Sequence, residues 1–408
     1  MANGSSPVPD GVFTRRQFLY ITGGTVFLGG LAGVLQACGS AATQAPAGGS
    51  AGAAASAGTC PKVVPASAKV GGAFNLFTWA GYDGKGVPAM DGFYKKDGIQ
   101  LNPKYISNEN LETYLKTPAG HVWDASSNNQ GDCEHGYASG IQSPISVEEV
   151  PALATMYPTF TDGTFWKVCE GIYNSVPWTW GPLGINTRPD RVPADALTSW
   201  DGLFDPKWTG RIGTYDDALN MISTAACATK NDPGKLTRDQ LNGPVKSWLL
   251  KLKPQLKVLS TSIGDQLNVL EAGDVDIELV GLLWFVAQSK QTKGKPVDFR
   301  VPKEGTYGFV DAVIITPWAA DRQNAIAYAN ALMQGSTAVA MQESTFQMST
   351  NPDVNSQISA DVRDLYPKDL ASYLQNTLKW NKSWYDPNSQ YATIDEWRKV
   401  WEDVKAGA

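Results

Sequence analysis

The sequence predicts an α/β protein whose parallel sheets carry helices on both faces. Apolar runs typical of buried strands alternate with segments of helical spacing: Phe74–Trp79 precedes a helix through Val87 and Tyr94, and Ile99–Ile106 follows. Because each helix would return the chain to the same edge, this alternation favours parallel pairing. The chain has 408 residues, of which 42% are hydrophobic and 18% charged, enough for two domains of ordinary size.

Residues 1–37 are predicted to be a Tat-type lipoprotein signal peptide. Twin arginines, Arg15 and Arg16, precede a mildly apolar, glycine-rich run, as in a twin-arginine export signal that carries folded cargo. The run ends in Leu35-Gln36-Ala37-Cys38, which resembles the lipobox of bacterial lipoproteins, so Cys38 would carry the lipid. An uncleaved membrane anchor is the alternative, although the run is marginal in length for spanning.

Residues 38–68 are predicted to be a lipidated, flexible tether, because 39–59 consist almost wholly of Gly, Ala, Ser, Thr, Gln and Pro. The folded part would then lie outside the cytoplasmic membrane, where cysteines can pair. Two disulfides in any of three pairings are open to the remaining cysteines, Cys60, Cys133, Cys169 and Cys227. With two histidines and no CxxC spacing, the sequence predicts no metal site.

Polar residues follow the first strands, where an open α/β sheet binds its ligands. Trp79 and Tyr82 come at the end of the first strand, in a stretch rich in turn residues. Ser107–Asn110 is a predicted helix N-terminus after the second strand. A third strand, His121–Ser127, leads into the polar segment Ser126–Gln130.

The second half of the chain continues the alternation. Val176–Asn186 is an apolar run interrupted by prolines that could carry the chain to a second lobe. The Asp216-Asp217 pair opens a predicted helix, where carboxylates also make good caps. The remaining predicted elements are a short helix at 199–204, a strand at 210–213, a helix at 264–272, strands at 275–280 and 308–315, and a helical C-terminal third.

Five motifs resemble those of one known family. They are FNLFTWAGY (74–82), SNENLETYLKT (107–117), SWDGLFDPKWTGRIGTYDDA (199–218), LEAGDVDIELVG (270–281) and PKEGTYGFVDAVIITPWA (302–319). In order and spacing they are similar to the spermidine/putrescine-binding branch of the bacterial extracellular solute-binding proteins of ABC importers. The resemblance implies a two-lobed, periplasmic-binding-protein-like fold of type II. Each lobe would hold a mainly parallel sheet flanked by helices, and a two-strand hinge would let the lobes close on ligand.

The resemblance also implies lobes that are discontinuous in sequence. Lobe 1 would comprise residues 69–182 and 306–350, and lobe 2 would comprise 183–305 and 351–408. The chain would cross near Trp180–Asn186 and return near Gly305–Gly308, with a further exchange near residue 350.

A polyamine site would need carboxylates for the ammonium groups and aromatic walls for the methylenes between them. On the positions that match the family, the resemblance implies carboxylates at Asp217 and Asp311 and a polar contact from Asn129, where the family has a Ser. It implies an aromatic contact from Trp79 and a hydroxyl contact from Tyr82. It also implies an aromatic wall from Phe309, where the family has a Trp, and one from Trp284 if the local register shifts.

Three further positions depart from the family pattern. Asn220 replaces a Glu, Gln347 replaces a Tyr, and direct register places Gly281 where a Trp is expected, with Trp284 three residues later. Fewer carboxylates and aromatics favour a ligand shorter or less charged than spermidine. Putrescine, another small amine, or an amino-acid-like or phosphonate-type compound would fit.

The predicted function is that of a membrane-tethered substrate-binding lipoprotein of an ABC importer, located outside the cytoplasm. It would be a monomer that captures a small amine and delivers it to the permease, with no catalysis and no cofactor. The formal net charge of −6, without a basic stripe, argues against nucleic acid as a partner.

Two alternatives remain open. In a secreted glycoside hydrolase, Asp217 and Asp311 would act as the carboxylate pair, although the sequence lacks the GxSxG, HExxH and P-loop motifs of other enzyme classes. A receptor for a sugar or another solute could share the same fold.

Overall fold

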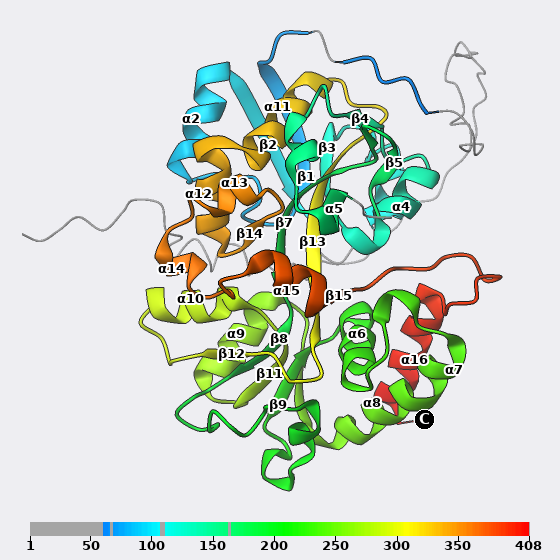
Figure 1. Cartoon of the computed structure of the whole chain (residues 1–408), viewed down its shortest axis with the longest axis vertical. Helices are drawn as coiled ribbons and strands as arrows, with labels where there is room; N and C mark the ends of the chain where they lie inside the picture. Colours follow the sequence, from blue (N-terminus) through cyan, green and yellow to red (C-terminus); the bar gives the residue numbers. More distant parts are fainter. Residues whose placement is uncertain (1–59, 66–67, 107–110, 162–164, 408) are drawn as a thin grey trace, which may run out of the picture. The chain divides into compact units, whose positions relative to one another are not determined.

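The computed structural model describes residues 60–65, 68–106, 111–161 and 165–407, all of which belong to one compact unit. The predicted signal peptide, Cys38 and the tether up to residue 59 lie outside the described residues. Within the described part the strands form sheets of seven, five and three strands (Figure 1).

The seven-stranded sheet has the order β14-β7-β13-β3-β1-β2, with β15 paired to β13. Its strands are β1 (Gly72–Thr78), β2 (Ile99–Tyr105), β3 (Ala125–Asn129), β7 (Val176–Pro182), β13 (Thr306–Ile315), β14 (Met348–Ser349) and β15 (Leu378–Trp380). As predicted, β1 pairs in parallel with β2 and β3, whereas β13 runs antiparallel to β3 and β7. The carboxyl ends of β1 and β3 therefore meet at one edge, next to the middle of β13.

The five-stranded sheet has the order β10-β9-β11-β8-β12. Its strands are β8 (Gly184–Thr187), β9 (Ile212–Tyr215), β10 (Leu256–Ser260), β11 (Ile277–Gly281) and β12 (Asp298–Arg300). Here β9 pairs in parallel with β10 and β11. A small sheet joins β4 (Ile145–Ser146), β5 (Lys167–Cys169) and β6 (Ile172–Tyr173).

Helices connect these strands. The α-helices are α2 (Pro88–Asp97), α3 (Leu111–Leu115), α4 (Gln130–Ala138), α5 (Pro158–Thr161), α6 (Ala218–Ala228), α7 (Arg238–Gln240), α8 (Lys246–Leu252), α9 (Ile263–Ala272), α10 (Leu283–Gln291), α11 (Arg322–Met333), α12 (Gly335–Thr345), α13 (Pro352–Asn355), α14 (Ala360–Arg363), α15 (Leu370–Asn376) and α16 (Ile394–Ala406). Shorter turns of helix are η1 (Pro151–Thr155), η2 (Trp200–Phe204), η3 (Pro206–Trp208), η4 (Pro233–Lys235), η5 (Leu241–Val245) and η6 (Lys253–Gln255).

We call the parts built around the seven-stranded and five-stranded sheets lobe 1 and lobe 2. The chain passes from β7 to β8 between Pro182 and Gly184, and returns between β12 and β13 at residues 301–305. Each lobe has its own principal core, one around Phe74, Trp178 and Trp180 and the other around Trp200 and Ile212. The two-lobed α/β fold predicted from the sequence is confirmed.

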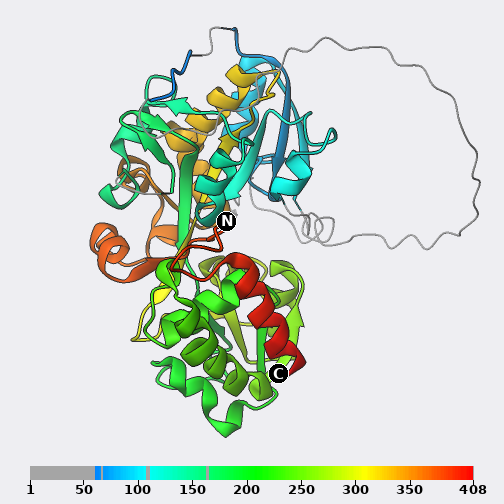
Figure 2. The ribbon, with the colours of Figure 1, turned by 90° about the vertical axis from the view of Figure 1, so that its right-hand side faces the viewer.

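The C-terminal segment is shared between the two cores. Val362 and Leu374 pack in the core of lobe 1, whereas Trp397 and Trp401 of α16 pack in that of lobe 2; Figure 2 shows α16 in red beside the lobe 2 helices. The lobe boundaries stay a prediction. The packing favours an exchange after Trp380, rather than near residue 350, and we propose the boundary there.

Two local features differ from the sequence interpretation. The third strand begins at Ala125 rather than His121, because residues 117–123 form turns, so Ser126–Asn129 lie within β3 rather than beyond it. The described cysteines form one disulfide, Cys60–Cys169, which joins a residue within the predicted tether (38–68) to β5, while Cys133 and Cys227 are buried thiols. No helix in the described residues is long and apolar enough to cross a membrane.

Candidate functional site

Asp311 lies at the centre of the predicted site, in the middle of β13. Its register partners are Asn129 on β3 and Thr179 on β7. The Tyr82 hydroxyl donates to Asp311 Oδ2 over 2.6 Å, and Asn129 Nδ2 donates to Asp311 Oδ1 over 3.2 Å. The antiparallel pairing of β13 with β3 thus brings together three predicted ligand-binding residues that lie far apart in the sequence.

The Asp311 carboxylate is buried, at 7% exposed, and it forms no ion pair with any Lys, Arg or His of the described residues. Burial raises its pKa to about 6, although the hydrogen bonds from Tyr82 and Asn129 act in the opposite direction. A buried carboxylate is stabilised when a cation lies beside it. The site is therefore suited chemically to a positively charged group.

Two tryptophan rings pack around Tyr82, the residue that donates to Asp311. Tyr82 contacts Trp79 edge to face, with ring centroids 5.7 Å apart, and contacts Trp178 at 4.9 Å. Trp79 is only partly buried. The turn that carries both residues is held in place because the Tyr328 hydroxyl donates to the Tyr82 carbonyl over 2.6 Å.

Two polar residues that the sequence analysis did not assign complete the hydrogen bonds around Tyr82. Gln347 Nε2 donates to the Tyr82 hydroxyl over 3.1 Å, and the Thr179 hydroxyl donates to Gln347 Oε1 over 2.8 Å. Gln347 therefore occupies a supporting position where the family pattern expects a Tyr. The sequence analysis missed Thr179 because it lies inside an apolar run. A polar residue between two tryptophans, Trp178 and Trp180, was the one sequence feature that could have indicated it.

In lobe 2, Asp217 caps the N-terminus of α6, as its capping chemistry predicted. Asp217 Oδ1 accepts hydrogen bonds from both the backbone nitrogen and Nδ2 of Asn220, each over 2.8 Å. No described residue donates a side-chain or capping hydrogen bond to Oδ2. Burial raises the Asp217 pKa, the Asn220 hydrogen bonds and the charge of Arg398 lower it, and nearby Asp132 raises it. The neighbouring Asp132, at the start of α4, was not predicted.

Tyr307 joins this part of lobe 2 to the strand that carries Asp311. Its hydroxyl donates to Asn220 Oδ1 over 2.9 Å, so Asn220, where the resemblance expects a Glu, bonds both Asp217 and Tyr307 of β13. Tyr307 and Asp311 lie four residues apart on β13 and face the same side of the sheet. Both residues belong to a quoted motif, but only Asp311 was singled out.

The remaining predicted residues are placed as follows. Phe309 is partly buried on the same face of β13 as Asp311, and its ring packs so closely on Gly181 that a Cβ there would lie 2.9 Å from it. Trp284 packs beside Phe285 on α10, with ring centroids 5.8 Å apart. Asp216 accepts from Trp401 Nε1 over 2.8 Å and from Lys405 over 3.0 Å, and so anchors α16.

The structure therefore groups Trp79, Tyr82, Asn129 and Asp311 and places Phe309 beside them on the same strand. It links Asp217 to this strand through Asn220 and Tyr307. Trp284 packs beside Phe285 in lobe 2. The roles of all seven in ligand binding stay a prediction.

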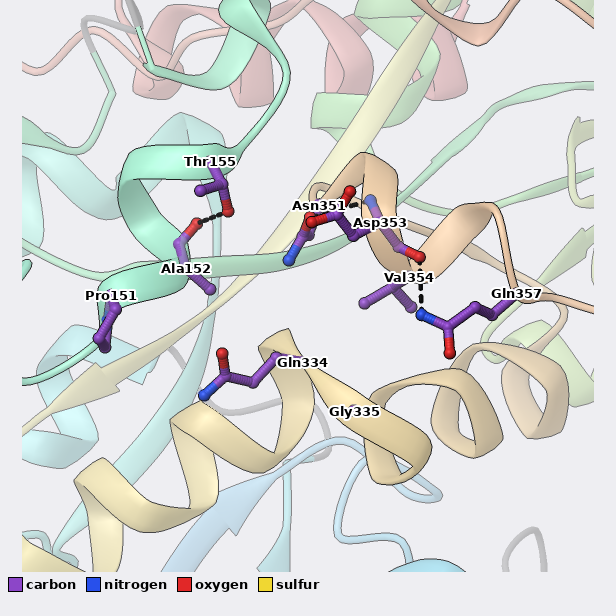
Figure 3. A pocket seen from close by; sticks show the side chains of 9 residues that line it. All are labelled: Pro151, Ala152, Thr155, Gln334, Gly335, Asn351, Asp353, Val354 and Gln357. Atoms are coloured by element: carbon purple, nitrogen blue, oxygen red, sulfur yellow. Dashed lines mark hydrogen bonds between the residues drawn. The ribbon is translucent and has the colours of Figure 1, made fainter.

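A pocket of about 310 Å³ lies elsewhere, in lobe 1 between η1, the start of α12 and α13 (Figure 3). None of the predicted site residues lines it. Its polar side chains mostly bond their own turns: Gln357 Nε2 donates to the Asp353 carbonyl over 2.9 Å and Thr155 to the Ala152 carbonyl over 3.1 Å. We interpret this pocket as a surface hollow and not as a ligand-binding site.

The described residues contain no group of three or more His, Cys, Asp or Glu side chains that could hold a metal ion.

Comparison with known proteins agrees with this architecture. A family model described as bacterial extracellular solute-binding protein matches residues 88–367. The putrescine-binding periplasmic protein PotF of Escherichia coli K12 is 24% identical over 353 residues, covering 82% of this chain and 91% of that protein. Spermidine/putrescine-binding periplasmic protein 1 of Haemophilus influenzae is 24% identical and covers 84% of this chain and 91% of its own length.

Among solved structures, the spermidine/putrescine ABC transporter substrate-binding protein PotD of Streptococcus pneumoniae superposes with a TM-score of 0.66 at 16% identity. It covers 82% of this chain and 99% of that structure. At this identity the similarity establishes the fold.

Proposed function

Because this chain belongs to the bacterial extracellular solute-binding protein family, we propose that it is the substrate-binding component of an ABC importer for a small cationic amine, with putrescine as the first candidate. It would hold the amine between its two lobes and deliver it to the transmembrane subunits of the permease, without a catalytic step and without a cofactor. The names of relatives that bind putrescine or spermidine support this choice of ligand class.

The observation that carries the proposal is the buried Asp311 carboxylate, which lacks a cationic partner in the described residues but accepts hydrogen bonds from Tyr82 and Asn129. An ammonium group beside it would supply the missing charge. Trp79 and Phe309 would then contact the methylene chain, and a ring that lies over an ammonium group would add cation–π attraction of about 0.5–2 kcal/mol.

Asp217 in lobe 2 would receive the second ammonium group. Burial raises its pKa, the hydrogen bonds from Asn220 and the charge of Arg398 lower it, and the carboxylate of Asp132 raises it; an ammonium group beside Asp217 would favour its ionised form. Ligand contacts on both lobes would favour a closed form, which the permease would recognise by a population shift.

We also propose that the protein acts outside the cytoplasm, held to the membrane by a lipid on Cys38, and that it functions as a monomer. The twin-arginine and lipobox motifs support the anchor, and the periplasmic location named for its relatives supports the compartment. Mass spectrometry of the membrane fraction tests the anchor: Cys38 should carry a diacylglyceryl group, and Cys38→Ala should release the protein into the medium or periplasm.

Isothermal titration calorimetry of the purified mature protein tests the ligand. The compounds are putrescine, spermidine, a basic amino acid, 2-aminoethylphosphonate and maltose. We expect binding of putrescine at micromolar affinity or tighter, with a shift in tryptophan emission and with the ligand recovered unchanged. Binding of maltose alone would favour a sugar receptor, and release of a cleaved glycoside would favour the hydrolase.

Putrescine affinity should fall as the pH is lowered through 6. The ammonium group binds the ionised form of Asp311, whose pKa burial raises to about 6, so protonation competes with the ligand. We expect Kd at pH 5 to be about tenfold higher than at pH 7, with little change between pH 7 and 8.

Tyr82→Phe gives the matched comparison for this pH dependence. It removes a hydrogen bond that lowers the Asp311 pKa, so the loss of affinity should begin at a higher pH than in the wild type. An affinity that stays constant from pH 5 to 8 in both proteins would argue against Asp311 as the ammonium contact.

A further inference from the structure

A buried chain of side-chain hydrogen bonds links the two lobes near β13, the strand that follows the return crossing at residues 301–305. In lobe 1 it begins at Gln130, the first residue of α4 and the direct neighbour of Asn129. Gln130 Oε1 accepts from the backbone nitrogen of Val310 over 2.8 Å, next to Asp311 on β13. Gln130 Nε2 donates to Asn381 Oδ1 over 2.7 Å.

The same asparagine continues the chain into lobe 2. Asn381 Nδ2 donates to the Ser223 hydroxyl on α6 over 3.2 Å, and that hydroxyl donates to the Leu219 carbonyl over 2.6 Å. Gln130, Asn381 and Ser223 are at most 3% exposed. The amide of Asn381 therefore presents its oxygen to lobe 1 and its nitrogen to lobe 2, which fixes its orientation.

Asn381 directly follows β15, which pairs with Thr306–Gly308 at the start of β13. The segment after it contacts both lobes. The backbone nitrogen of Ser383 donates to the Gly131 carbonyl of lobe 1 over 3.2 Å. Trp384 Nε1 donates to the Gly234 carbonyl of lobe 2 over 2.9 Å. The C-terminal segment thus forms a third passage of the chain between the lobes.

We propose that Asn381 is a positioning residue that fixes α4 of lobe 1 and α6 of lobe 2 relative to each other during ligand binding. α4 begins immediately after Asn129, and α6 begins immediately after Asp217. Asn381 would therefore maintain the position of Asn129 in lobe 1 relative to the Asp217 carboxylate in lobe 2. This role rests on the proposed function, because it assumes that both lobes contact one ligand.

We call the two hydrogen bonds of Asn381, to Gln130 and to Ser223, the interlobe tie. It is sensitive to substitution because both of these partner side chains are buried. An apolar residue at 381 leaves Gln130 Nε2 and the Ser223 hydroxyl without this bond, and burial makes such loss unfavourable. Asn381→Leu removes the bonds to both lobes, whereas Ser223→Ala removes the lobe 2 bond alone. Asn376→Leu is the matched control, since the exposed Asn376 amide bonds Ser372 of its own helix and no other described residue.

The first measurement needs no ligand. Spin labels are placed on cysteines introduced at exposed Lys96 in lobe 1 and exposed Asp239 in lobe 2; the two free thiols of the described residues, Cys133 and Cys227, are buried. Electron–electron double resonance then gives the distribution of distances between the lobes. We expect a broader distribution in Asn381→Leu and in Ser223→Ala, and the wild-type width in Asn376→Leu. Wild-type widths in both test variants would overturn the proposal.

The second measurement is the Kd for putrescine. Asn381→Leu and Ser223→Ala should each raise it about tenfold, and the double variant should bind no more weakly than Asn381→Leu alone because both act on the same tie. Unchanged or tighter binding, or additive losses, would contradict the proposal. If Asn381→Leu does not fold, Ser223→Ala decides alone. If wild type does not bind putrescine, the proposed ligand fails, and the interlobe distances still decide this inference.

Discussion

Replacing Asp311 with Asn should raise the Kd for putrescine by at least about 100-fold. The substitution keeps the shape of the side chain but removes the charge that would pair with an ammonium group. Losing one member of a buried, hydrogen-bonded ion pair costs about 3 kcal/mol or more, which corresponds to about two orders of magnitude in affinity. Calorimetry of the variant and wild type at pH 7.5 measures the loss.

The same substitution should not weaken the fold, which separates a lost contact from a misfolded protein. Burial raises the pKa of Asp311 in the folded state, so its ionised form disfavours folding at neutral pH, and a neutral amide removes that penalty. We expect a thermal midpoint equal to or above that of wild type. Asp361→Asn, at an exposed position on α14, is the control. Binding within threefold of wild type would exclude Asp311 as the principal ammonium contact.

The fold was predictable because the local patterns of strand and helix along the sequence are enough to specify its parallel strand pairs. The apolar run of β1, the periodic helix after it and the second apolar run of β2 specify a parallel pair that burial then fixes. The site was predictable only through the family resemblance. Tyr82 and Asp311 are 229 positions apart in the sequence, and no local pattern indicates that β13 inserts antiparallel beside β3.

The site residues and the disulfide that sequence reasoning missed depend on contacts between distant segments. Thr179 matters because β7 places it next to Gln347, and Asn381 matters because β15 brings it between α4 and α6. The single disulfide has the same origin: of the pairings open to four cysteines, the fold brings only Cys60 and Cys169 together among the described residues.

Glu278→Gln should stabilise the protein at alkaline pH by several kcal/mol. Glu278 lies on β11 and is completely buried. Gln266 Nε2 donates to its Oε2 over 3.0 Å, whereas no described residue donates to its Oε1. Its Oε1 lies so close to Gly213 that a Cβ at that position would clash. Burial raises the pKa of this carboxyl group from its ordinary 4.5 to about 8, while the bond from Gln266 lowers it.

The sign of the pH effect follows from where the proton is bound. Between pH 4.5 and 8 the folded protein keeps the Glu278 proton and the unfolded chain has lost it, so raising the pH favours unfolding. Each pH unit in that window lowers the free energy of unfolding by up to about 1.4 kcal/mol, and about 5 kcal/mol accumulates by pH 8. A neutral glutamine does not titrate, and it can supply an amide donor near the unpartnered Gln266 Oε1.

Urea denaturation at pH 5 and at pH 9 measures this difference. Wild type and Glu278→Gln should have similar midpoints at pH 5, and the variant should have the higher midpoint at pH 9. Other buried carboxyl groups, including Asp311 and Asp217, titrate in both proteins, so the difference between the two curves isolates Glu278. Glu148→Gln, at an exposed position, should follow wild type. Parallel pH dependence in wild type and Glu278→Gln would mean that Glu278 ionises with nearly the same pKa in the folded and unfolded chains, and that water reaches its carboxyl group.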